Sequence, residues 1–159
     1  DNKTIELPSS LDIKNSIIEE RVRELLKIAN QTFIVRNNYI HLIDRGEASC
    51  LALSEILSRK GIRNVISTDE RTTRMLCESP SNLHKLLETK LHTKIKINSE
   101  NFTEFQKFKI IRSSELVYIA HKNKLVDLKD GNVLDALLYA VKFKGCSVSR
   151  NEIEEIKKL

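Results

Sequence analysis

Two acidic turns joined by one helix constrain this chain more than any other feature. The first turn is Asp44-Arg45-Gly46-Glu47, and the second is Ser67-Thr68-Asp69-Glu70. Between them, residues 48–60 have the apolar spacing of a helix, Gly61 ends that helix, and residues 62–66 predict a short buried strand. Because a helix that leads into a parallel strand returns onto the sheet with a right-handed connection, we expect both turns at one edge of a sheet.

That edge is where open α/β sheets bind their ligands. Carboxylates gathered there suit a hard cation such as Mg²⁺, which prefers oxygen ligands and keeps several waters. Each acidic residue also has a purely structural interpretation. Asp44 and Glu47 have the spacing of a capping box, and Asp69 is placed to cap a helix that begins near Arg71. The residues alone leave both interpretations open.

The size and composition predict one soluble globular domain over residues 1–159. The chain is 40% hydrophobic and 31% charged, and it has neither an apolar stretch long enough to span a membrane nor a recognisable signal peptide. Its three cysteines are odd in number and far apart, which favours free thiols in a reducing compartment. We therefore expect a cytoplasmic protein with no membrane partner.

The net charge of +5 comes from one stretch of the chain. Residues 84–124 contain nine Lys or Arg and four Glu, whereas the remainder is balanced. A basic stretch beside an acidic metal site suits a phosphodiester substrate, because cations neutralise the nucleic-acid backbone. Lys107, Lys109 and Arg112 are the candidate RNA-binding residues. A solvated Lys-rich face is an equally good interpretation of the same stretch.

Helices and short strands alternate along the rest of the chain, which indicates one α/β layer fold. Hydrophobic periodicity predicts helices over residues 11–30, 72–78, 82–91 and 102–122, the last either continuous or broken at residues 112–114, and two further helices near the C-terminus. The final helix is expected to begin with a capping box, Ser149-x-x-Glu152. The predicted strands are residues 33–35 and 94–97. Phe102, Phe105 and Phe108 recur at every third residue, a spacing that favours a place in the core over base stacking.

The two turns and their spacing resemble the PIN domain family, in its prokaryotic branch. The resemblance is carried by Gly46-Glu47-Ala48 at a helix start, by residues 65–70 as a strand ending in Thr-Asp, and by Arg74 in the next helix. Residues 114–117, 124–126 and 147–149 are similar to the end of the same branch. The likeness covers residues 31–159, and residues 79–111 match it loosely.

The resemblance implies a three-layer α/β/α fold around a central, mainly parallel sheet. It also implies a ribonuclease that uses Mg²⁺ or Mn²⁺, with RNA as substrate and an antitoxin, another protein or a second copy of the chain as partner. By position, Glu47 and Asp69 would be the catalytic, metal-binding carboxylates. The supporting residues would be Thr68, Glu70, Arg74 and Asp44.

One departure from the family weighs against activity. The family opens with a strand that ends in a metal-binding Asp, and residues 1–4 lack the apolar strand that would precede such an acid. The chain is therefore expected to lack that opening strand. The alternative function is a catalytically degenerate PIN-like module that binds RNA or protein without cutting it.

Overall fold

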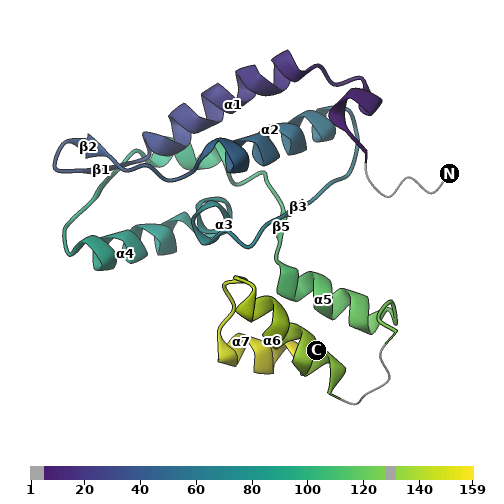
Figure 1. Ribbon diagram of the computed structural model, residues 1–159. Helices are drawn as coiled ribbons and strands as arrows, with labels where there is room; N and C mark the ends of the chain where they lie inside the picture. Colours follow the sequence, from purple (N-terminus) through teal and green to yellow (C-terminus); the bar gives the residue numbers. More distant parts are fainter. Residues whose placement is uncertain (1–5, 128–131) are drawn as a thin grey trace.

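The computed structural model describes residues 6–127 and 132–159, which form two bodies (Figure 1). The N-terminal body comprises residues 6–111, and the C-terminal body comprises the described residues from 112 onward. The helices of the N-terminal body are η1 (Pro8–Leu11), α1 (Asn15–Asn30), α2 (Arg45–Arg59), α3 (Arg71–Glu78), α4 (Pro80–Leu91) and η2 (Ser99–Glu104). Its strands are β1 (Phe33–Val35), β2 (Asn38–Tyr39), β3 (Ile66–Ser67), β4 (Lys96–Ile97) and β5 (Ile110–Ile111). The C-terminal body contains α5 (Ser113–Lys122), α6 (Val133–Phe143) and α7 (Arg150–Ile156).

Two long helices, α1 and α2, lie side by side in the N-terminal body (Figure 1). Helix α1 confirms the helix predicted over residues 11–30, and its apolar stripe buries Val22, Leu25 and Ala29. It begins only at Asn15 because the preceding residues form the 3₁₀ turn η1, after which Asp12 adopts a positive φ of 53°. Helix α2 buries Ala48, Leu51 and Ala52 against the same core.

The expected three-layer α/β/α fold with a central, mainly parallel sheet is wrong. The described strands form two small sheets, one with the order β2-β1-β4 and one with the order β3-β5. Strand β1 pairs antiparallel with both neighbours, with Ile34 opposite Tyr39 and Phe33 opposite Ile97. Only β3 and β5 are parallel, with Ile66 opposite Ile110. The chain is mostly helical, and the sheets occupy short stretches between the helices.

Local turn chemistry explains part of this correction. Arg36 and Asn37 both have positive φ, as in the two-residue turns that join antiparallel strands, so residues 33–39 close into a hairpin. The strand predicted over residues 62–66 pairs only over Ile66 and Ser67. The helix predicted over residues 102–122 is instead η2, β5 and α5, because residues 105–107 form a turn and Ile110–Ile111 form a strand.

The main core lies in the N-terminal body and confirms the prediction for the phenylalanines. Phe33 and Phe105 are fully buried, Phe108 is 6% exposed, and Phe102 packs against them. The ring centroids of Phe33 and Phe102 are 5.8 Å apart. These rings therefore contribute to packing of the core.

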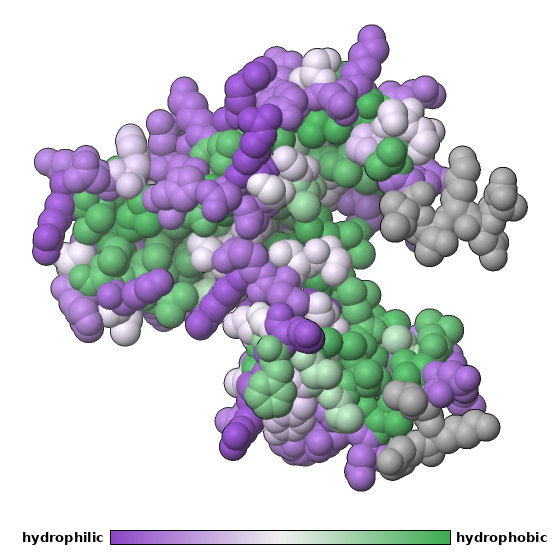
Figure 2. Space-filling model, viewed as in Figure 1, coloured by the Kyte–Doolittle hydropathy of each residue, from purple (hydrophilic) through white to green (hydrophobic). Residues whose placement is uncertain are grey.

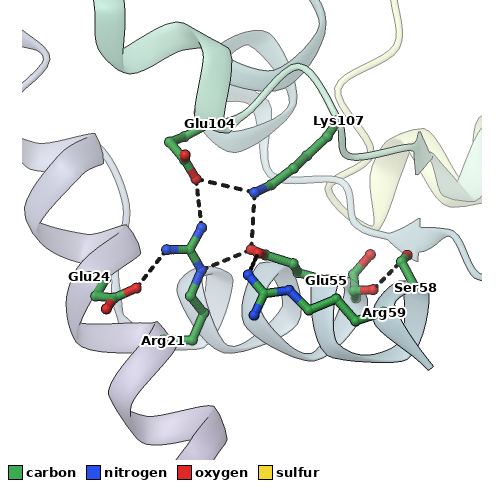
Figure 3. A network of polar contacts seen from close by, with 8 residues as sticks. Arg21, Glu24, Glu55, Ser58, Arg59, Glu104 and Lys107 are labelled. Atoms are coloured by element: carbon green, nitrogen blue, oxygen red, sulfur yellow. Dashed lines mark hydrogen bonds and ion pairs between the residues drawn. The ribbon is translucent and has the colours of Figure 1, made fainter.

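A network of charged side chains joins α1, α2 and the end of η2 (Figure 3). Arg21 of α1 donates to Glu55 of α2 at 2.8 Å and to Glu104 of η2 at 2.6 Å. Lys107 lies 3.2 Å from both of these carboxylates, and Arg59 also pairs with Glu55. Glu55 is buried, so the surrounding cations are what make its ionised form tolerable there.

The C-terminal body has its own, smaller hydrophobic cluster. Its buried members are Leu138, Cys146, Val148, Ile153 and Ile156. Helix α7 begins with the predicted capping box, in which the Ser149 hydroxyl accepts from the Glu152 backbone N–H at 3.1 Å. All three cysteines are free, as predicted. Across both described ranges, every helix is too short or too polar to cross a bilayer.

Candidate active site

The first acidic turn is held in place by an asparagine from α1. The side-chain oxygen of Asn30 accepts from the backbone N–H groups of Leu42 and Ile43, at 2.6 and 3.1 Å, and its amide donates back to the Ile43 carbonyl. The Asn30 side chain thus forms hydrogen bonds with this segment like those that a neighbouring strand would form. This fixes the segment that enters α2 and sets the position of Glu47 in the first turn of that helix.

Glu47 combines a capping role with a place in a small pocket. One of its carboxylate oxygens accepts from the Asp44 backbone N–H at 3.1 Å, so the predicted capping box forms. The residue is half-buried and lines a pocket of about 140 Å³. Thr68 lines the same pocket, as do Gly46, Cys50, Leu51, Ile66, Ser67 and Thr73. The start of α2 and the end of β3 therefore meet here, but Asp69 of the second acidic turn does not line the pocket.

Asp69 follows Thr68 but is turned toward the C-terminal body. Its two carboxylate oxygens accept from the Ser113 backbone N–H at 2.9 Å and from the Ser113 hydroxyl at 2.6 Å. Burial opposes ionisation of this carboxyl, but the hydrogen bonds from Ser113 and Cys146 and the charge of Arg112 outweigh it and lower its pKa. Asp69 is thus an ionised carboxylate that ties the end of β3 to the start of α5.

Thr68 and Glu70 organise the start of α3. The Thr68 hydroxyl accepts from the Glu70 backbone N–H at 3.1 Å. The Glu70 carboxylate accepts from the backbone N–H groups of Thr72, at 2.9 Å, and Thr73. Burial raises the pKa of Glu70, but the hydrogen bonds from these backbone donors lower it by more. The pKa of Glu70 is therefore below its usual value. The helix cap of α3 is therefore Glu70, whereas the sequence assigned this role to Asp69.

The other two supporting residues lie farther from the pocket lining. The Arg74 guanidinium is 3.7 Å from Glu78, and its Nε is a buried donor without a hydrogen-bond partner. The exposed Asp44 carboxylate lies 2.7 Å from the His41 ring. Neither side chain lines the pocket that contains Glu47 and Thr68.

The residues around the pocket fit a divalent ion in part. No group of three or more His, Cys, Asp or Glu converges on a metal position within residues 6–127 and 132–159. Mg²⁺, however, is commonly bound by one or two carboxylates, with waters and substrate phosphates completing its shell. Among the residues that line the pocket, Glu47 supplies the single carboxylate.

The candidate RNA-binding residues separate into two groups. Lys107 and Lys109 line one pocket of about 270 Å³ together with Arg63. Lys107 is already paired with Glu55 and Glu104, which reduces its availability for a phosphate.

Arg112 lies apart from that pocket and has a structural role. Its side chain is 11% exposed and pairs with Glu115 at 2.8 Å and Glu152 at 2.9 Å. Burial works against its charge, but these two carboxylates raise its pKa overall. Arg112 therefore joins α5 to α7.

Sequence reasoning missed Ser113, Cys146 and Arg63. Ser113 was visible as part of a break at residues 112–114, and serine is a favoured residue at helix starts. Its contact with Asp69 spans 44 residues, and no local pattern indicates it. Arg63 carried no signal beyond its charge.

Comparison with described protein families, with characterised proteins and with solved structures found no match to this chain.

Proposed function

We propose that this protein is a metal-dependent ribonuclease in which Glu47 and Asp69 bind Mg²⁺ or Mn²⁺. The observation that supports the proposal is the meeting of two distant segments: Glu47 and Thr68 line one pocket, and Asp69 directly follows Thr68. The resemblance of these same residues to the PIN family supports the same choice of chemistry. RNA is the proposed substrate, and a toxin or an RNA-processing enzyme of the cytoplasm is the proposed role.

The side chains have separable tasks in this proposal. Glu47 keeps one carboxylate oxygen on the α2 cap and has the other available for a cation. Asp69 stays ionised because its pKa is low, and Ser113 orients it. A bound divalent ion would polarise a phosphoryl oxygen and lower the pKa of its water. Thr68 fixes the strand end that carries Asp69, through its bond to the Glu70 backbone.

A second candidate, RNA binding without cleavage, is favoured by the basic pocket. Arg63 and Lys109 are exposed cations that pair with no carboxylate of the described residues, and they precede β3 and β5 in the chain. Such cations suit a phosphate backbone. This function would leave Glu47 and Asp69 as helix-cap and junction residues only.

A cleavage assay with a matched pair of capping glutamates separates the two candidates. The substrate is single-stranded RNA, with Mn²⁺ or with a chelator. Glu47→Gln keeps the capping interaction, since glutamine serves at this position, but it removes the charge. We expect Glu47→Gln and Asp69→Asn to slow cleavage by on the order of a hundredfold, because a metal contributes several kcal/mol of transition-state stabilisation.

Glu152→Gln is the control, because Glu152 occupies the same capping position in α7 and lies outside the site. It should leave cleavage and calorimetric Mn²⁺ affinity unchanged, whereas Glu47→Gln should weaken Mn²⁺ binding. Metal-independent RNA binding with no cleavage, unaffected by Glu47→Gln, would establish the second candidate and reject the nuclease.

A further inference from the structure

Strand β3 has one unpaired edge. The backbone N–H groups of Ile66 and Thr68 donate to the carbonyls of Lys109 and Ile111 on the β5 side, at 2.9 and 3.1 Å. Because backbone groups alternate in direction along a strand, the N–H and carbonyl of Ser67 point away from β5. Ser67 is exposed, and no other strand of the described chain pairs with β3 on that side.

A continuous depression follows this edge between β3 and α2. One pocket of about 220 Å³ is lined by Leu53, Leu57 and Val65 and shares Cys50, Ile66 and Ser67 with the pocket that contains Glu47. We call this depression the β3 trough, formed by Cys50, Leu53 and Leu57 of α2 and residues 64–68. Figure 2 shows a notch between the two bodies with hydrophobic residues on both walls, whereas the β3 trough lies within the N-terminal body.

The β3 trough has charges of opposite sign at its two ends. At the start of β3 it shares Ser54 and Asn64 with the basic pocket of Arg63 and Lys109. At the end of β3 it reaches Glu47. Its middle is apolar, and Val65 is 52% exposed there. A nucleic-acid backbone would meet apolar side chains along this middle, so the chemistry favours a polypeptide.

We propose that the β3 trough binds an extended segment of a partner protein, which pairs with Ser67 as an added strand. Such strand addition gains affinity from main-chain hydrogen bonds and specificity from pockets for alternate side chains. The segment has apolar residues at alternate positions, an acidic residue beside Arg63 and Lys109, and a basic residue beside Glu47. It covers an edge that otherwise exposes unpaired backbone groups and apolar surface. This inference does not depend on the proposed nuclease, but the bound segment would cover the pocket of Glu47 and so compete with RNA for it.

Peptide binding in a metal-free buffer with chelator tests the proposal apart from any cleavage. The probes are nine-residue peptides with valine at alternate central positions, aspartate at one end and lysine at the other, in both orders. We expect one order to bind and to slow hydrogen exchange at the Ser67 amide. Methylating the backbone nitrogens that face Ser67 should weaken binding about tenfold or more, since it removes backbone hydrogen bonds.

Two variants of the protein make the test specific to the strand edge. Ser67→Pro removes the outward N–H, whereas the N–H groups that bind β5 belong to Ile66 and Thr68 and are kept. We expect about a tenfold loss of peptide affinity for Ser67→Pro and no loss for Ser67→Ala. Circular dichroism checks that Ser67→Pro is folded. If it is not, the affinity of the wild-type protein for the methylated peptide tests the strand pairing instead.

Three outcomes would overturn the proposal. One is the absence of binding by either peptide order. Another is equal binding of the methylated and unmethylated peptides. The third is protection of Ser67 by a single-stranded RNA oligonucleotide but not by the peptides.

Discussion

The two bodies of the molecule are stabilised in different ways. The N-terminal body has a cluster of sixteen buried residues, whereas the cluster of the C-terminal body has five. The N-terminal body also buries a charged network around Glu55, while the C-terminal body relies on helix caps and on Arg112. The larger core makes the N-terminal body the scaffold, and the C-terminal body is attached to it through β5 and the contact of Asp69 with Ser113.

This difference changes how the candidate site is interpreted. Glu47 belongs entirely to the N-terminal body, since its hydrogen bond and its pocket involve residues 44–73. Asp69 instead bonds to the first residue of α5. Loss of Asp69 would therefore affect both chemistry and the junction between the bodies. Loss of the Glu47 charge affects the site alone, which makes Glu47→Gln the cleaner test of catalysis.

The largest effect is expected from breaking the network of the N-terminal body. Glu55→Ala leaves Arg21, which is 15% exposed, without its main partner in α2. Arg21 keeps Glu24 and Glu104 as partners. The variant loses a charge-assisted hydrogen bond between mostly buried side chains, which costs about 2 kcal/mol. Denaturant unfolding measures the loss, and Glu24→Ala is the control.

Glu24 pairs with the same Arg21 but is 53% exposed. Its removal should cost less than about 1 kcal/mol, as for other surface pairs. Equal losses for Glu24→Ala and Glu55→Ala would show that burial of the network adds nothing to the stability of the N-terminal body.

The sequence predicted the elements with local signals and missed the arrangement that depends on distant contacts. The α1 stripe, the capping boxes at Asp44 and Ser149, and the buried phenylalanines all follow from spacing within a few residues. The predicted central parallel sheet was wrong, because strands of two residues give almost no pattern from which their pairing could be inferred. Strand β5 was hidden inside a segment whose apolar residues, from Phe102 to Ile111, also fit a helix.

Only the part of the candidate site that is formed by residues close together in the sequence could be predicted. The approach of the Glu47 turn to Thr68 was inferred from a helix-strand unit, and the structure places the two in one pocket. The orientation of Asp69 toward Ser113 was not inferable, because it is set by where the C-terminal body docks. Arg112 was assigned to RNA by its charge, and the carboxylates that neutralise it lie 3 and 40 residues away in the chain.

Acid should weaken the C-terminal body through Glu152. Burial opposes ionisation of Glu152, but the Ser149 backbone and Arg112 lower its pKa from 4.5 to about 2. Since the folded pKa is the lower one, its stabilisation is present above pH 4.5 and is lost as the pH falls toward about 2. We therefore expect wild type to exceed Glu152→Gln in unfolding free energy near neutral pH, with the difference shrinking across that window.

Tyrosine fluorescence provides the measurement, because Tyr118 and Tyr139 pack against the C-terminal cluster and the chain has no tryptophan. The third tyrosine, Tyr39, is 55% exposed in the N-terminal body. A difference between the two proteins that stays constant from pH 6 to about pH 2 would contradict the role given to Glu152.

The smallest effect is expected from the cap of α7. Ser149→Ala removes the hydroxyl that accepts from the Glu152 backbone N–H, and such a loss costs about 1 kcal/mol. Ser149→Asp should restore the stability, because aspartate caps helices as well as serine does. Both variants are compared with wild type by denaturant unfolding. Because α7 contributes Ile153 and Ile156 to a cluster of five, the loss should appear in the C-terminal tyrosines. A loss in Ser149→Ala that Ser149→Asp does not recover would mean that the hydroxyl stabilises the body through some contact other than the cap.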